Sequence, residues 1–349
     1  MSQEALSGVF GFENRQTLAQ IEAGQRKLSA DELVTAVEAF DVPLDYFTNP
    51  FLIVGEGRFS WRRDVQTVAA DLKEFERKAG EWIGAYRSLS ASTGEALSPV
   101  VHRLNLTRSS SFEDAEAAGE WIASHFELLP VPSARLAETM QEKLSTLVLM
   151  VDARNGISGA ACLVRDLGAV LVNRQESPGR RNYDLAHELF HILTWDAMPP
   201  DAIDDGEGST KSQKRVEQMA DKFASALLMP RAVLDGYAGP ALDVGWLNRT
   251  ATALGVSSDA LRWRMVSLGR MDLGTARSID PALLRNNGGA FVPETRPPHR
   301  FGRRFMEVLG NGISQGHVSV RRVSALLDVS IDELGELFEV HGLVRPFDL

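Results

Sequence analysis

The alternation of hydrophobic and polar positions predicts a mostly helical protein with one short run of strands. Between residues 65 and 95, large apolar side chains recur every three or four residues, which is the period of a helix with one buried face. Residues 109–126 and 133–144 repeat this pattern. Ser111, followed three residues later by Asp114, is a capping signal at the start of the first of these two stretches. The three stretches therefore predict three helices.

The pattern changes near residue 145. Short apolar runs rich in β-branched residues occupy residues 147–151, 156–164 and 168–173, and such runs predict buried strands. Two helical patterns follow, at residues 183–193 and 216–229, and Pro230 ends the second. This order of elements predicts an α+β domain in which a small sheet packs on the 183–193 helix.

Both ends of the chain are predicted to be helical. Residues 3–10, 15–23 and 29–40 form three short helical patterns, and Ser29 with Glu32 makes a capping box for the third. Near the other end, residues 301–309, 320–327 and 331–338 predict a small helical module. We divide the chain into an N-terminal domain (1–50), a helical connector (51–130), the α+β core (131–235), a helical extension packed on the core (236–285), and a linker with the C-terminal module (286–349).

Composition narrows the possible functions. A formal net charge of −10 argues against nonspecific binding of polyanions by the whole molecule. Because there is no run of eighteen apolar residues and no signal peptide, we expect a cytoplasmic protein with no membrane partner. The single cysteine, Cys162, cannot form an internal disulfide, which fits a reducing cytoplasm. Its apolar neighbours predict a core residue rather than a nucleophile.

The clearest chemical motif is His-Glu-x-x-His at residues 187–191. On a helix, His187 and His191 are four residues apart and lie on one face, so both imidazoles can reach one metal ion. Glu188 is placed to accept a proton from water at that metal, as in a zinc hydrolase. On the following helix, Glu217 can supply a third ligand, and Asp221 can accept a hydrogen bond from the outer nitrogen of a ligand histidine.

The stretch from Tyr183 to Pro230 resembles the ImmA/IrrE family of metallopeptidases. The first shared motif is Ala-His-Glu-Leu-Phe-His at residues 186–191. The second is Glu-x-x-Ala-Asp-x-Phe-Ala followed by Leu-Leu-Met-Pro, within residues 217–230. The resemblance as a whole extends over roughly residues 145–235. The resemblance implies a zincin-like fold that binds Zn²⁺ through His187, His191 and Glu217, with Glu188 as the general base. Tyr183, Arg181 and His317 are candidates for stabilising the oxyanion.

Residues 2–47 resemble the helix-turn-helix domain of Xre/Cro-type repressors. The resemblance rests on Ser-Gln-Glu-Ala-Leu at residues 2–6, Gly11, Gln-Thr-Leu at 16–18, Ile-Glu-Ala-Gly at 21–24, Leu33, and Val-Pro-Leu-Asp-Tyr-Phe at 42–47. The chain starts inside what corresponds to the second helix, so we expect the first helix of the usual bundle to be missing. The residues expected to meet base edges are Arg15, Gln16, Thr17 and Gln20.

Charge weakens the case for DNA binding by this domain alone. Residues 1–50 hold three basic and eight acidic side chains, a net charge of −5, whereas nonspecific affinity for DNA comes mostly from phosphate neutralisation. A role in protein interaction, or no remaining role, is therefore an open alternative.

Three other stretches have weaker signals. Residues 59–63 place an aromatic side chain beside two arginines, which we interpret as an arm that packs between domains, with phosphate contact as the alternative. The Pro-, Gly- and acid-rich residues 198–210 predict a mobile loop near the site. Residues 244–269 resemble another helix-turn-helix with local basic charge, and we favour packing on the core over DNA contact.

Together these features predict a zinc-dependent endopeptidase that performs limited proteolysis of a protein. The resemblance implies that the substrate is a transcriptional repressor, in bacterial stress or mobile-element regulation. Two alternatives remain: a DNA-binding transcriptional regulator whose zinc domain is a sensor or structural part, and an interaction module without catalysis. The sequence predicts no oligomeric state.

Overall fold

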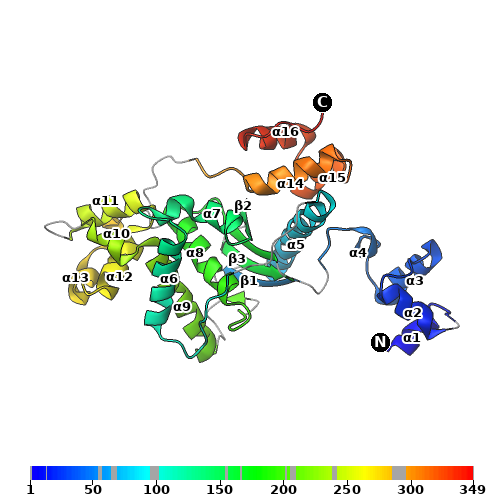
Figure 1. Cartoon of the computed structure of the whole chain (residues 1–349), viewed down its shortest axis with the longest axis horizontal. Coiled ribbons are helices and arrows are strands. Elements are labelled where there is room, and N and C mark those ends of the chain that lie inside the picture. Colours follow the sequence, from blue (N-terminus) through cyan, green and yellow to red (C-terminus); the bar gives the residue numbers. More distant parts are fainter. Residues whose placement is uncertain are drawn as a thin grey trace. The chain divides into compact units, whose positions relative to one another are not determined.

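The computed structural model describes residues 2–12, 14–53, 57–63, 69–94, 102–153, 156–165, 167–200, 203–204, 210–237, 242–284 and 296–348. The chain divides into two compact units, Met1–Leu52 and Ile53–Leu349, and each is described by itself (Figure 1). Within the described residues, no helix combines the length and apolar character that crossing a bilayer requires.

The first unit is a group of four helices, α1 (Gln3–Val9), α2 (Arg15–Glu22), α3 (Ala30–Phe40) and α4 (Asp45–Thr48). Local capping explains their starts. The Asn14 side chain accepts a hydrogen bond from the Gln16 backbone N–H at the start of α2. Ser29 and Glu32 form the predicted capping box of α3. Leu18 and Ala36 are buried between the helices.

The second unit is organised around a five-stranded mixed sheet with strand order β2-β4-β3-β1-β5. The edge strand β2 is parallel to β4, β3 is antiparallel to β4, β1 is antiparallel to β3, and β5 is parallel to β1. Every residue of β4 is buried, so the strand reads as a continuous apolar run rather than an alternating one. The bounds are β1 (Gly57–Arg63), β2 (Thr146–Val151), β3 (Ile157–Val164), β4 (Leu167–Asn173) and β5 (Ile203–Asp204).

Three helices form the core against this sheet. Helix α8 (Pro178–Thr194) packs on β3 and β4, α9 (Lys211–Leu228) packs on α8, and α6 (Phe112–His125) packs on α9. The last contact is very close at Gly119, where an added Cβ would lie 2.4 Å from the Phe223 carbonyl oxygen. A glycine is therefore required where α6 crosses α9.

Shorter helices close the same core at one end (Figure 1). The turn between α11 and α12 lies against the start of α8, because a Cβ on Gly179 would be 2.6 Å from the Ser257 backbone nitrogen. The Ser133 hydroxyl donates a 2.6 Å hydrogen bond to the Leu254 carbonyl. The helices are α7 (Pro132–Glu142), α10 (Arg231–Asp235), α11 (Val244–Leu254), α12 (Ser258–Ser267), α13 (Leu273–Ser278) and the 3₁₀ turn η1 (Pro281–Leu283).

The C-terminal helices α14 (Arg303–Ser314), α15 (Val320–Leu327) and α16 (Ile331–Val340) form a module with the long helix α5 (Ala69–Ser92). Aromatic contacts join them, because Trp82 packs edge-on against Phe301 and Tyr86 stacks on Phe305. The Phe301 backbone N–H donates a 2.6 Å hydrogen bond to the Met150 carbonyl on β2. Residues far apart in sequence thus meet beside the sheet.

The structure has the α+β, predominantly helical fold class that the sequence predicts, with a small sheet on the helix that carries His187 and His191. One interpretation is corrected: residues 59–63 are not an arm that packs between domains but part of strand β1, Gly57–Arg63, in the sheet. Its hydrogen-bonding partner, β3, is about a hundred residues away, so no local pattern indicates the pairing. Most of the predicted 286–298 linker and of the 198–210 loop lies outside the described residues.

Candidate metal centre

Helix α8 carries three of the candidate site residues in its buried middle. Pro178 opens the helix, where its missing N–H costs no hydrogen bond. From Asp184 to Thr194 every residue is buried, and His187, Glu188 and His191 are each no more than 2% exposed. Polar side chains are this deeply buried only where they have partners, which points to a function for the three.

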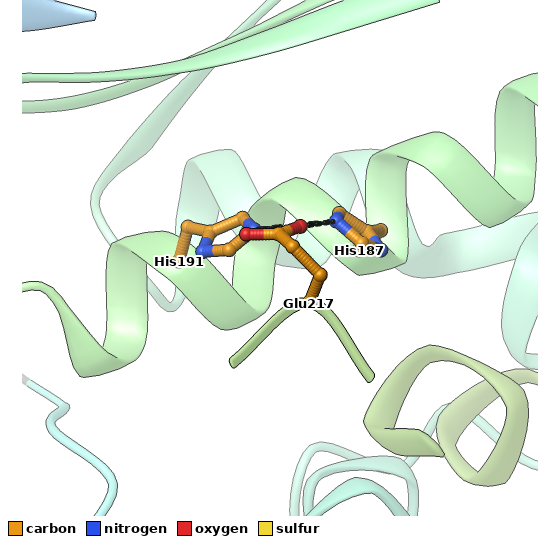
Figure 2. Close-up of side chains that lie close together, drawn as sticks. All are labelled: His187, His191 and Glu217. Carbon is orange, nitrogen blue, oxygen red and sulfur yellow. Dashed lines mark hydrogen bonds and ion pairs between the residues drawn. The ribbon is translucent and has the colours of Figure 1, made fainter. Parts of the chain in front are cut away.

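Glu217 reaches the two histidines from α9. A capping box between Thr210 and Gln213 starts this helix, and its apolar face packs on α8, which turns Glu217 toward the histidines. Figure 2 shows the Glu217 carboxylate between the two imidazole rings. Its Oε2 lies 3.1 Å from His187 Nε2 and 3.4 Å from His191 Nε2, and the two Nε2 atoms are 3.2 Å apart.

This triangle has the size that a tetrahedral zinc ion requires. Zinc binds histidine nitrogen and carboxylate oxygen at roughly 2.0–2.2 Å, and a tetrahedron of that radius has edges of about 3.3–3.6 Å. The three measured separations, 3.1, 3.2 and 3.4 Å, are close to this edge length. The three side chains therefore fit three corners of one tetrahedron and leave the fourth corner for another ligand.

The protonation of His187 also favours a metal ion at this position. An ionised Asp221 can only accept, so its 3.0 Å contact with His187 Nδ1 places the ring proton on that nitrogen. In a neutral ring, Nε2 then presents a lone pair to the Glu217 carboxylate oxygen. Two electron-rich atoms 3.1 Å apart favour a cation between them. Among the described residues, the buried Nδ1 of His191 has no hydrogen-bond partner.

Charge around Glu217 keeps it ionised. Burial acts to raise the pKa of Glu217, but the hydrogen bonds of the adjacent His187 and His191, and the positive charge of these rings when they are protonated, outweigh it and hold the pKa well below its usual range. A carboxylate that stays ionised is ready to act as a metal ligand over the whole physiological pH range.

A short chain of contacts orients His187 from the outside. Asp221 lies one turn after Glu217 on α9 and contacts His187 Nδ1. The Tyr183 hydroxyl donates a 3.0 Å hydrogen bond to the Asp221 carbonyl and lies 3.4 Å from its Oδ1. Such outer partners fix the tautomer and the ring orientation of a ligand histidine. Tyr183 thus fixes the position of Asp221, and Asp221 fixes the orientation of the His187 ring.

Glu188 lies on the sheet side of α8, beside β3. An added Cβ on Gly159 would lie 3.6 Å from Glu188 Cγ and 3.7 Å from its Oε1. Gly159 is not among the site residues that the sequence predicts. The only local signal for it is a glycine inside an apolar strand, which often marks a close approach of the backbone to another group.

The three candidates for stabilising the oxyanion are in different places. Tyr183 is beside the histidines, as described. Arg181 donates through Nη1 to the carbonyls of Arg174 and Glu176, so it is engaged in the loop before α8. His317 lies in the turn between α14 and α15, in the C-terminal module.

The four candidate DNA-contacting residues are in the first turns of α2. Arg15, Gln16 and Gln20 are exposed, and Thr17 is half-buried, while Leu18 faces the interior. Helix α2 therefore presents one polar face to solvent.

Comparison with protein families assigns both regions. Residues 142–265 match the model of a peptidase family described as the IrrE N-terminal-like domain, and this stretch includes His187, Glu188, His191 and Glu217. Residues 1–47 match a helix-turn-helix family model. A search of curated proteins finds no significant match. The two matches show a helix-turn-helix region fused in one chain to a metallopeptidase-like region that is similar to the IrrE N-terminal-like domain.

Proposed function

We propose that this protein is a zinc-dependent endopeptidase that performs limited proteolysis of a protein substrate. The observation that carries the proposal is the triangle of His187, His191 and Glu217, which has tetrahedral dimensions. A structural zinc site normally fills all four positions with protein groups. Here three candidate ligands lie beside the buried Glu188, and three protein ligands with a nearby carboxylate base are typical of a catalytic zinc site.

The chemistry follows from the side chains present. His187, His191 and Glu217 would hold a zinc ion here, and the ion would supply a Lewis acid for the peptide carbonyl and for the attacking water. Glu188 would accept the proton of the attacking water and pass it to the leaving amine. Asp221 would keep His187 in the tautomer that leaves Nε2 free to bind the metal.

For the substrate, we propose a transcriptional repressor, in bacterial stress or mobile-element regulation. The support is the fusion itself, because a helix-turn-helix domain in the same chain is suited to bringing the peptidase to regulators or to DNA. Incubating the purified protein with repressors encoded beside its gene tests this proposal. Cleavage of one of them at a single site is expected, and cleavage of unrelated proteins alone would contradict it.

The central experiment combines metal analysis with a cleavage assay. Wild-type protein is expected to hold about one zinc per chain, and His187→Ala is expected to lose it. Glu188→Gln is expected to keep its zinc and to lose cleavage activity, because the amide cannot accept the proton. A chain that binds no zinc even when zinc is supplied would refute the proposed function.

The helix-turn-helix match favours a second candidate function, a DNA-binding regulator whose zinc domain is a sensor or a structural part. Salt-dependent, sequence-specific binding to DNA from its own promoter by Glu188→Gln protein would support this function. Loss of that binding in His187→Ala would assign the sensor role to the zinc domain. We also place the protein in the cytoplasm, where its buried free thiol, Cys162, stays reduced.

A further inference from the structure

Strand β1 comes from outside the peptidase-family domain, yet it completes that domain's sheet. The family match covers residues 142–265, whereas β1 spans Gly57–Arg63. It pairs antiparallel with β3 along its whole length, from Gly57 opposite Val164 to Arg63 opposite Ile157. Without β1, β3 would be an edge strand with a free row of backbone donors and acceptors.

That edge lies next to the candidate general base. Gly159 on β3 is the residue whose added Cβ would lie 3.6 Å from Glu188 Cγ, and its partner across the sheet is Arg62 of β1. Neighbouring strands are about 4.8 Å apart. The backbone of β1 therefore runs one strand spacing from the strand that flanks Glu188.

An extended polypeptide is recognised by adding a strand to a free sheet edge, because the backbone hydrogen bonds supply affinity for any sequence. The β3 edge beside Glu188 is the place where such a strand comes closest to the base, and β1 already fills it. On its other side, the pairing of β1 that the described residues show is with Ile203 and Asp204 of β5, which belongs to the segment between α8 and α9. An incoming strand replaces the hydrogen bonds of β1 with equivalent ones.

We propose that β1 is a resident inhibitory strand, which must leave the β3 edge before a substrate segment can pair there beside Glu188. This inference rests on the proposed peptidase function. The substrate segment it implies is an extended one that resembles β1 itself, Gly-Arg-Phe-Ser-Trp-Arg-Arg, with aromatic and basic residues. Only residues 53–56 separate β1 from the first unit. Binding of a partner to the helix-turn-helix domain can therefore act on β1 through this short connection.

The register of β1 against β3 allows the two strands to be joined by a disulfide that reduction breaks again. Phe59 lies directly opposite Cys162, the only cysteine of the chain. Directly opposed residues of antiparallel strands have Cα atoms about 4.5–5.5 Å apart, which is within the range of a disulfide. Phe59→Cys therefore allows one disulfide that ties β1 to β3. Burial, with a smaller effect of Glu76, raises the pKa of the Cys162 thiol, so oxidation is run for a long period and scored by loss of both free thiols.

The expected result is that oxidised Phe59→Cys cleaves its substrate at least tenfold more slowly than the same protein after reduction. The reduced protein is the matched control, because it carries the same substitution without the bond. A release variant, Phe59→Asp, puts a charge at a position that is 8% exposed and is expected to raise cleavage several-fold, whereas Phe59→Leu stays near wild type. Equal rates for oxidised and reduced protein would overturn the proposal.

A binding assay separates this inference from the proposed function. A fluorescent peptide with the sequence of residues 57–63 is titrated onto full-length chains that also carry Glu188→Gln, so that it is not cut. We expect at least tenfold tighter binding to the Phe59→Asp chain than to the oxidised Phe59→Cys chain. If this difference holds but no variant cleaves any protein, the peptidase function fails and the exchangeable strand stands. Equal binding to both chains would overturn the inference even where cleavage is observed.

Discussion

Gly159 sets the distance between β3 and Glu188. A Cβ at this position would lie 3.1 Å from the Leu171 carbonyl oxygen, which must give way, and 3.6 Å from Glu188 Cγ, which is an ordinary van der Waals contact. The strain therefore falls on the pairing of β3 with β4, directly beside Glu188. Misplacement of a catalytic group by about 1 Å can cost roughly a hundredfold in rate. We predict that Gly159→Ala lowers the cleavage rate about tenfold or more while zinc content stays at the wild-type value. Gly80→Ala, on α5 with no atom within 4 Å of the added Cβ, is the control and should leave the rate unchanged.

In the proposed metal site, Asp221 would act on the metal through its contact with His187 Nδ1, so its effect is expected in metal affinity. Removal of such an outer partner typically weakens metal binding by about 10–100-fold. We predict a loss of this size for Asp221→Asn in a competition titration with a zinc chelator. Asp196→Asn, which alters an exposed ion pair with Arg103, is the matched control and should bind zinc as wild type does. Equal affinity in both variants would show that Asp221 does not orient His187.

At the residue scale, the sequence is informative where chemistry follows helical spacing. The four-residue step from His187 to His191 places both on one face of any helix, and Glu217 and Asp221 share a face for the same reason. The position of Gly159 depends instead on how β3 packs against α8, which is a tertiary contact. No spacing in the sequence encodes that contact.

Among the elements, α12 is tied to α6 and α9 by one buried arginine. Arg264 is 1% exposed and forms ion pairs of 2.8 Å with Glu116 and 2.6 Å with Glu120, and its Nε donates to the Met229 carbonyl. Breaking a buried pair costs about 3–5 kcal/mol. Since both glutamates are partly exposed, we predict that Arg264→Met lowers the free energy of unfolding by about 2–3 kcal/mol.

This loss can be read by tryptophan fluorescence during denaturation, because all six tryptophans lie in the second unit. Arg270→Met, which breaks a pair with the exposed Asp235, is the control and should cost less than about 1 kcal/mol. A similar loss in both variants would contradict a special role for Arg264.

The same cluster predicts a pH dependence. Burial acts to raise the pKa of Glu116, but Ser267, Arg264 and Lys222 outweigh it, and the pKa lies below its ordinary value of 4.5. A pKa lowered by folding stabilises the native state above the ordinary value, and this stability is lost as the pH falls through the lower one. Wild type should therefore lose part of its stability below about pH 4.5, and Glu116→Gln should lose less over the same range.

Elements with local signals are predicted well, and the strand with a distant partner is not. The capping residues Ser29 and Ser111 place the starts of α3 and α6 within one residue of their observed positions. Strand β1 depends on β3, about a hundred residues further along, and its run of aromatic and basic residues carries no clear alternation. Pairing over such a distance is a property of the folded chain.

For the whole molecule, segments outside residues 142–265 meet the sheet on both sides. On one side β1 pairs with β3, and on the other the Phe301 N–H donates a hydrogen bond to the Met150 carbonyl of β2. Free edges invite pairing with other chains, and covering them prevents it. The flanking regions thus protect the peptidase-family domain as well as connect it.

The metal should stabilise only the unit that holds its ligands. His187, His191 and Glu217 all come from α8 and α9, inside Ile53–Leu349. A ligand present at a hundred times its dissociation constant stabilises the native state by about 2.7 kcal/mol. For a unit of this size, that corresponds to a fall in Tm of roughly 4 °C when a chelator removes zinc. We predict this fall in the tryptophan transition of wild type and no further fall in His187→Ala, which lacks the metal from the start.

Hydrogen exchange on the same samples tests the other half of the prediction. Amides of α1, α2 and α3 should keep their protection when zinc is removed, because the three candidate ligands lie in the other unit and Met1–Leu52 is compact by itself. Amides of α8 and α9 should lose protection, since the ion joins these two helices. If the helix-turn-helix amides lost protection to the same degree, the two units would unfold together. Zinc would then control the stability of the whole chain, as the sensor function requires.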